Sequence, residues 1–183
     1  MKKTILTFGL ASGVLMSLMM AATVPFADRI GFDKGEVVGY ATMVLAFLLV
    51  FFGIRFYRED AGNGQITFAR AFAVGISIML ITCLFYVVTW EILYFKFMPD
   101  FMDKYTAYMV ARLQASGASA AAIQTQVEQM NKFKGLYSNP LYNAAVTFLE
   151  PLPVGLVITL VSAAVLRKKA PPEAAAASLP ASS

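Results

Sequence analysis

The sequence contains no histidine and a single cysteine, Cys83, which lies inside an apolar run. With one cysteine, no disulfide can form within the chain. Because histidine is the commonest metal ligand and acid–base catalyst near neutral pH, its absence counts against zinc, haem and imidazole chemistry. Sequence patterns of catalytic triads, phosphate-binding loops and metal sites are missing as well. We therefore expect no catalytic residue, no cofactor, no bound metal and no enzymatic activity.

Charged residues are also scarce. They make up 14% of the 183 residues, and hydrophobic residues make up 58%. A soluble domain carries roughly 25% charged residues. The net charge is +4, but the basic residues flank apolar runs, which favours the lipid bilayer over nucleic acid as their partner. The composition predicts an integral membrane protein that does not bind nucleic acid.

Four long apolar runs are present, and spans are expected at about residues 4–27, 37–56, 68–97 and 140–166. A helix needs about 20 apolar residues to cross a hydrocarbon core about 30 Å thick. The runs lack the alternation of a membrane β-barrel. The sequence thus predicts an all-α bundle of four transmembrane helices, forming one domain over residues 1–169. Lys2 and Lys3 leave a cleaved signal peptide open as the alternative for the first span, although its apolar run is longer than a typical signal core.

Basic residues close to the span ends indicate orientation, because such charges remain on the cytoplasmic side. The two N-terminal lysines precede the first span, and basic residues 167–169 follow the last. Both termini are therefore expected in the cytoplasm. Arg55, Arg58 and Arg70 fall on the same side. They are candidate contacts for lipid headgroups or a partner, and the simpler explanation, which we favour, is that they set the topology.

Residues 98–139 form the largest segment outside the spans. Apolar residues recur there at helical spacing on both sides of Gly117, which predicts one or two short amphipathic helices. Ser119 is expected to cap the second helix and Gly135 to end it. The Ala-, Pro- and Ser-rich tail over residues 170–183 is expected to be disordered.

Small residues recur at every fourth position of the first span, including Gly9, Gly13 and Ser17, and Gly155 begins a similar series in the fourth. In lipid, helices associate through close van der Waals packing, which small residues permit. We expect these residues to pack helices within one bundle. The alternative is that they form a homodimer or larger homo-oligomer.

Glu91 and Glu150 are the acidic residues within or bordering the spans. Ionising a carboxyl inside a membrane without a partner is costly. Glu150 is expected to lie deeper than Glu91, so it should be protonated or bonded to a partner such as Tyr86, Lys96 or Arg112. Intramembrane acids frequently mark functional sites.

Two prolines follow Glu150 at positions 151 and 153. Each removes a backbone donor and frees a carbonyl four residues earlier. Glu150, Thr147 and the freed carbonyls could form a polar site, as broken helices do in transporters. The candidate functional polar site comprises Glu150, Glu91, Thr147 and Tyr86. The alternative, which we favour, is a kinked helix end with a hydrogen-bonded carboxyl.

Three short runs carry a resemblance to a known family: GIRFYR at residues 53–58, GQITF at residues 64–68 and EPLPVG at residues 150–155. They are similar to the signature of the bacterial membrane family catalogued as domain of unknown function 4199. The resemblance covers about residues 4–169. It implies a four-span bacterial membrane protein with no assigned activity and brings no catalytic residue.

We expect a multi-pass protein of the bacterial inner (cytoplasmic) membrane that acts as a non-enzymatic accessory or envelope component. It would bind lipid or a membrane protein partner. The alternative is a small ion- or proton-coupled transporter that uses Glu91 and Glu150. The sequence does not indicate a substrate, a partner or an oligomeric state.

Overall fold

The computed structural model describes residues 1–168, so the tail expected over residues 170–183 lies outside the described residues. In chain order the elements are α1 (Lys2–Thr23), the short 3-10 helix η1 (Val24–Phe26), α2 (Ala27–Asp60), α3 (Phe68–Ile92), the π-helical turn η2 (Leu93–Phe97), α4 (Phe101–Ala115), α5 (Ala120–Tyr137), α6 (Pro140–Leu149) and α7 (Pro151–Leu166). Within residues 1–168, the only other regular pairing is one isolated bridge between Ile66 and Lys168. The all-α fold class is confirmed.

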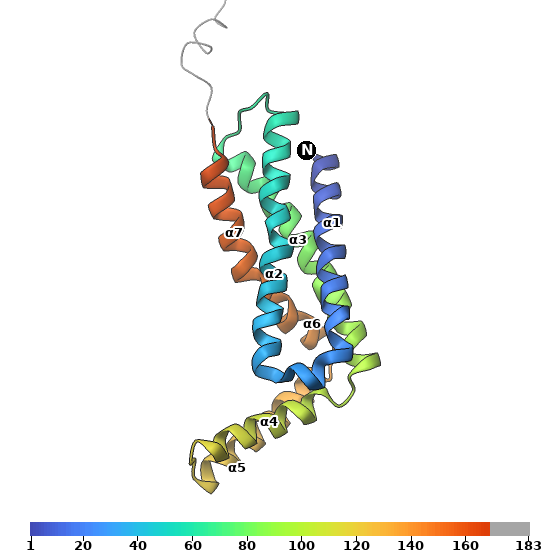
Figure 1. Ribbon diagram of the computed structural model, residues 1–183, viewed down its shortest axis with the longest axis vertical. Helices are drawn as coiled ribbons and strands as arrows, with labels where there is room; N and C mark the ends of the chain where they lie inside the picture. Colours follow the sequence, from blue (N-terminus) through green and yellow to red (C-terminus); the bar gives the residue numbers. More distant parts are fainter. Residues whose placement is uncertain (169–183) are drawn as a thin grey trace, which may run out of the picture.

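Three helical segments are long and apolar enough to cross a membrane: Lys2–Asp60, Phe68–Phe97 and Pro140–Leu166. Within the first of them, α1 and α2 run in opposite directions and pack against each other (Figure 1). Helices α3 and α7 complete the bundle. The chain start, the loop after α2 and the end of α7 all lie at one end of it (Figure 1).

The chain reverses direction through η1 and the first residues of α2. Pro25 lies in the first turn of η1, where its missing N–H costs no hydrogen bond. Gly31 interrupts α2 with a φ of 71°, a backbone conformation that favours glycine. Helix α2 begins at Ala27, well before the apolar run that starts near residue 37. The charged residues in between are exposed, and solvated charges are compatible with a helix.

The core of the bundle lies between α1, α2, α3 and α7. Phe47 and Ile54 of α2 are fully buried there, as is Ile78 of α3. Gly155 brings α7 close to α3, because a Cβ added to it would lie 2.5 Å from Cγ of Met79. The close approach that small residues permit is thus present at this helix contact.

Helix α1 packs against α3 along its small residues. A Cβ added to Gly13 would lie 2.5 Å from Cγ of Phe85, and a Cβ added to Gly9 would lie 2.8 Å from Cδ1 of Ile81. Ser17 Oγ lies 2.7 Å from Thr89 Oγ1 in a hydrogen bond between the two helices. This face of α1 therefore lies inside one chain's bundle.

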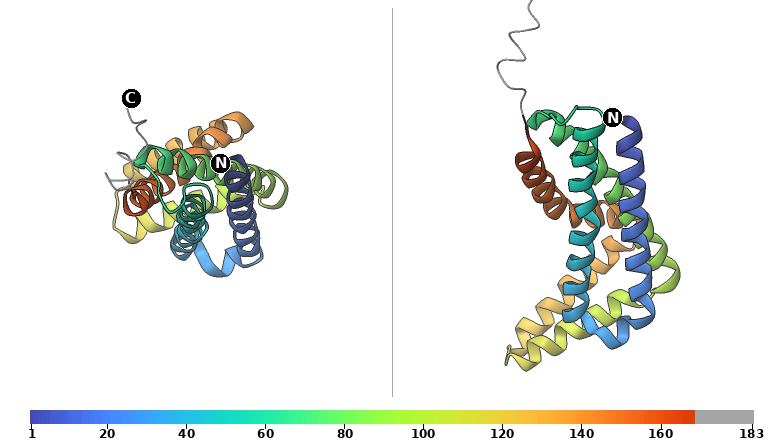
Figure 2. Two further views of the ribbon diagram at one scale, coloured as in Figure 1. Left: turned by 90° about the horizontal axis from the view of Figure 1, so that it is seen from above. Right: turned by 45° about the horizontal axis from the view of Figure 1, so that its top comes forward.

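Helices α4 and α5 form a hairpin that projects from the end of the bundle opposite the N-terminus (Figure 2). Gly117 makes the turn with a φ of 76°, and Ser119 Oγ accepts from the Ala122 amide at 3.3 Å to cap α5. The expectation that α5 ends at Gly135 was wrong, because the helix continues to Tyr137. Burial of the Tyr137 side chain against the bundle outweighs the cost of about 1 kcal/mol for a glycine inside a helix.

The hairpin is attached to the turn between α1 and α2. The Phe32 ring lies among aromatic rings of α4, at 5.3 Å from Tyr105 and 5.1 Å from Tyr108 between ring centroids. Lys104 Nζ lies 2.9 Å from Asp28 Oδ1 in an exposed ion pair. Because exposed ion pairs contribute little, the aromatic contacts supply most of this attachment.

Candidate functional site

Glu150 lies at the break between α6 and α7. Helix α6 ends at Leu149 and α7 begins at Pro151, so the carboxyl belongs to the single residue between them. Prolines 151 and 153 lack the backbone N–H groups that would continue the hydrogen bonding of α6. Glu150 is exposed at the side of the bundle, although the helices on both sides of it are predominantly apolar.

Of the partners considered for Glu150, the structure brings Tyr86 into contact. Tyr86 OH of α3 donates to Glu150 Oε2 at 2.7 Å, and the Tyr86 side chain is buried. Within residues 1–168, Glu150 forms neither a second hydrogen bond nor an ion pair. Among the described residues, the Glu150 carboxyl therefore has one hydrogen-bond donor and no cationic partner.

Thr147 belongs to a separate buried network beside this carboxyl. Trp90 Nε1 donates to Tyr137 OH at 2.8 Å, and Thr147 Oγ1 donates to Asn143 Oδ1 at 3.1 Å. Tyr137 OH lies 3.2 Å from Thr147 Oγ1. Since the threonine proton is already directed at Asn143, the tyrosine is the donor of this bond. The network fastens the end of α5 to α3 and α6.

Sequence reasoning missed the network that Asn143, Tyr137 and Trp90 form with Thr147. The available signal for Asn143 was its spacing from Thr147, which places the two on one helical face. Burial raises the pKa of the Tyr137 phenol. The bond that Trp90 Nε1 donates opposes that rise, and the charge of Glu150 adds to it. Tyr137 therefore keeps the proton that it donates.

Glu91 does not lie beside Glu150. It follows Leu84 and Val88 at helical spacing, and those two side chains are 60% and 51% exposed on the outer face of α3. Within the part of the chain that the structure describes, Glu91 Oε1 is buried without a hydrogen-bond partner. The two acids therefore belong to different surroundings and do not form one binding site.

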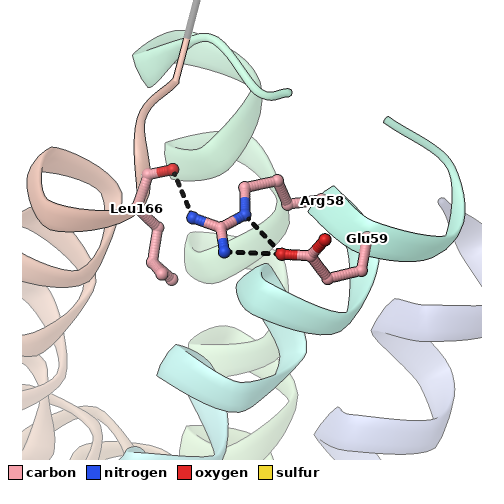
Figure 3. Close-up of polar contacts among 3 residues, drawn as sticks. All are labelled: Arg58, Glu59 and Leu166. Carbon is pink, nitrogen blue, oxygen red and sulfur yellow. Dashed lines mark hydrogen bonds and ion pairs between the residues drawn. The ribbon is translucent and has the colours of Figure 1, made fainter. Parts of the chain in front are cut away.

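The three candidate arginines differ in their contacts and exposure. Arg58 donates through Nη1 to the carbonyl of Leu166 at 3.3 Å and through Nε to Glu59 Oε1 at 2.9 Å (Figure 3). It thereby satisfies a carbonyl at the C-terminus of α7, where a positive charge is favourable. Arg55 and Arg70 are exposed and form no ion pair within residues 1–168. Only these two are available to a lipid headgroup or a partner.

The loop after α2 is joined to the end of α7. The backbone groups of Ile66 and Lys168 exchange two hydrogen bonds, both 2.9 Å long. The turn requires glycine at Gly62, because an added Cβ would lie 2.1 Å from the carbonyl oxygen of Gln65. Gly64 has a φ of 79°. Backbone conformation and backbone contacts thus explain the GNGQI run in physical terms.

Two shallow apolar grooves flank the break at Glu150. The groove between α3 and the α6–α7 pair has a volume of about 450 Å³, and its lining includes Met79, Leu80, Leu149, Leu152 and Leu156. The groove between α2 and α7 has a volume of about 440 Å³ and is lined by Val44, Pro153, Val154, Val157 and Ile158. Both are suited to hydrocarbon chains rather than to polar ligands.

The described residues contain no group of three or more His, Cys, Asp or Glu side chains that could hold a metal ion. A family model described as "Protein of unknown function (DUF4199)" matches residues 7–168 of the chain. No curated protein and no solved structure matches the chain.

Proposed function

Because the chain belongs to the DUF4199 family, as the resemblance of its motifs predicted, and because that family has no assigned function, we propose a function from the geometry of the chain. The protein is a non-enzymatic component of the bacterial inner membrane that acts by binding. Its ligand is a lipid or a membrane partner, and the binding site is the break at Glu150. It crosses the membrane four times with both termini in the cytoplasm.

Helix lengths and directions support four crossings. Helix α1 has 22 residues, which correspond to roughly 33 Å at 1.5 Å per residue, and the part of α2 that follows the interruption at Gly31 is longer than α1. Each is long enough for a hydrocarbon core about 30 Å thick, and the two run in opposite directions. The chain start, the end of α2, the start of α3 and the end of α7 lie at one end of the bundle (Figure 1). These segments contain the N-terminal lysines, Arg55, Arg70 and Arg167, which supports a cytoplasmic location for that end.

The binding proposal is supported by the exposure of the Glu150 carboxyl and its lack of a cationic partner. Its carboxyl is exposed within an apolar helical segment, accepts one hydrogen bond from Tyr86 and has no cationic partner among residues 1–168. A carboxyl inside a membrane is costly unless its charge is satisfied. A bound ligand supplies the cationic partner that the described residues do not provide.

The transport alternative receives less support from the same geometry. Glu91 lies apart from Glu150, and the core between Glu150 and the N-terminal end of the bundle contains apolar side chains and uncharged hydroxyls such as Thr159 and Ser162. Transporters of ions or protons typically contain ionisable side chains along the path. Among the described residues, no charged side chain lies in that core.

Two measurements test the proposed function. Reporter fusions at the two chain ends should both give a cytoplasmic signal, and a fusion at the α4–α5 turn should give the opposite one. Purification in mild detergent should yield a lipid or a protein in a fixed ratio to the chain. A C-terminal reporter on the outer side would contradict four crossings with both termini in the cytoplasm. Proteoliposome flux that Glu150→Gln abolishes would replace binding by transport.

A further inference from the structure

We propose that the break between α6 and α7 binds one phospholipid with a primary-amine headgroup, of the phosphatidylethanolamine kind, from the extracytoplasmic leaflet. The ammonium lies on Glu150, and an acyl chain lies in the groove between α3 and α7. This inference rests on the proposed function and names the ligand of the same site.

The charges at the break fit an ammonium group. Glu150 Oε2 already accepts from Tyr86, which leaves the second carboxylate oxygen to accept from a ligand. Within residues 1–168, no lysine or arginine forms an ion pair with this carboxyl. A nearby cation favours the charged form of a carboxyl. A primary ammonium supplies both a positive charge and N–H donors. Phosphatidylglycerol has hydroxyl donors but no positive charge, and phosphatidylcholine has a positive charge but no N–H donor.

The depth of Glu150 fits a lipid headgroup. Along a straight helix, Glu150 lies roughly 25 Å from Arg167 at the basic end of α7. The hydrocarbon core is about 30 Å thick. The carboxyl is therefore within about one helical turn of the outer boundary, where a headgroup amine can reach it while its acyl chains extend toward the membrane centre.

The groove supplies the path for an acyl chain. It starts at Leu149, directly beside Glu150, and continues along α7 past Leu152 to Leu156. Met79 and Leu80 of α3 form the opposite wall. The groove thus leads from the carboxyl toward the membrane centre, the direction that the chains of an outer-leaflet lipid take. Its lining is apolar throughout, so it contributes affinity without discriminating between headgroups.

The test compares three lipids on the delipidated full chain in detergent, with binding measured by native mass spectrometry. Phosphatidylethanolamine, phosphatidylcholine and phosphatidylglycerol with identical acyl chains are titrated separately. We expect phosphatidylethanolamine to bind about tenfold more tightly than phosphatidylglycerol, because the latter has no charged ammonium to donate to the Glu150 carboxylate. Glu150→Gln should abolish this preference, and Glu91→Gln should retain it.

A second pair of variants tests the groove. Leu156 and Leu160 of α7 are 40% and 41% exposed, but only Leu156 lines the groove. Leu156→Trp should weaken all three lipids alike, and Leu160→Trp should bind them as the wild type does. These variants and the lipid comparison on the wild type remain decisive if Glu150→Gln fails to fold.

Equal binding of the three lipids by the wild type would overturn the proposal, and so would a headgroup preference that survives in Glu150→Gln. Full lipid binding by Leu156→Trp would overturn the assignment of the groove. A protein that co-purifies in a fixed ratio, with no lipid preference, would refute the lipid while leaving the proposed binding function in place. No bound lipid and no co-purifying protein would refute both.

Discussion

Replacing Gly13 by alanine should lower the thermal stability of the protein, whereas the same replacement at Gly39 should maintain or raise it. Both glycines lie inside long helices. A Cβ added to Gly13 would lie 2.5 Å from Cγ of Phe85 and 2.9 Å from its Cβ, so the clash involves the base of that side chain and requires α3 to move. A Cβ added to Gly39 meets no atom within 4 Å.

One contribution to the free energy of unfolding is the same at both positions, and a second contribution applies only at Gly13. Alanine is better than glycine inside a helix by about 1 kcal/mol, and this gain applies at both positions. Overpacking costs about 1–3 kcal/mol and applies at Gly13 alone. The two variants should therefore differ by about 1–3 kcal/mol in the free energy of unfolding. For a chain of this size, that corresponds to a difference in Tm of roughly 2–12 °C.

The assay is thermal unfolding followed by circular dichroism, with the wild type and both variants in the same detergent. Gly13→Leu should be less stable than Gly13→Ala, because a larger side chain enters the same contact. Equal Tm values for the Gly13→Ala and Gly39→Ala variants would show that α1 does not pack against α3 at this position, and the observed helix arrangement would then be wrong there.

Substitutions at Tyr137 and Arg58 test two further contacts. Tyr137→Phe removes the hydroxyl between Trp90 and Thr147 and should lower the free energy of unfolding by about 1 kcal/mol. It should also change the fluorescence of Trp90, the only tryptophan. Unchanged fluorescence and an unchanged Tm would contradict the network. Because burial raises the pKa of Tyr137 in the folded protein, its contribution is complete below about pH 10 and is lost as the pH rises further. Tm measured between pH 9 and 11 should therefore fall less steeply in Tyr137→Phe. Arg58→Gln should leave the Leu166 carbonyl without its side-chain donor and lower the free energy of unfolding by about 1 kcal/mol. Amide hydrogen exchange at the end of α7 should then be faster. Unchanged exchange would show that Arg58 does not stabilise this helix end.

The sequence alone predicted the helices and several of their ends. Apolar runs of sufficient length cross membranes as helices whatever their neighbours are, so the class of protein follows from composition. Caps follow from local chemistry too, and Ser119 and the turn at Gly117 lie where their side chain and backbone preferences predicted. The prolines after Glu150 likewise indicated a break in the last span.

Tertiary structure decided which polar groups meet. Glu150 bonds to Tyr86, Thr147 joins Asn143 and Tyr137 in a separate network, and the other candidate acid lies on a different face of α3. These pairings depend on the rotation and vertical offset of one helix relative to the next. Contacts such as a glycine against an aromatic ring fix both quantities. A helix has the same local sequence preferences at every rotation, so only the packing of the bundle determines which of its faces meets a neighbour.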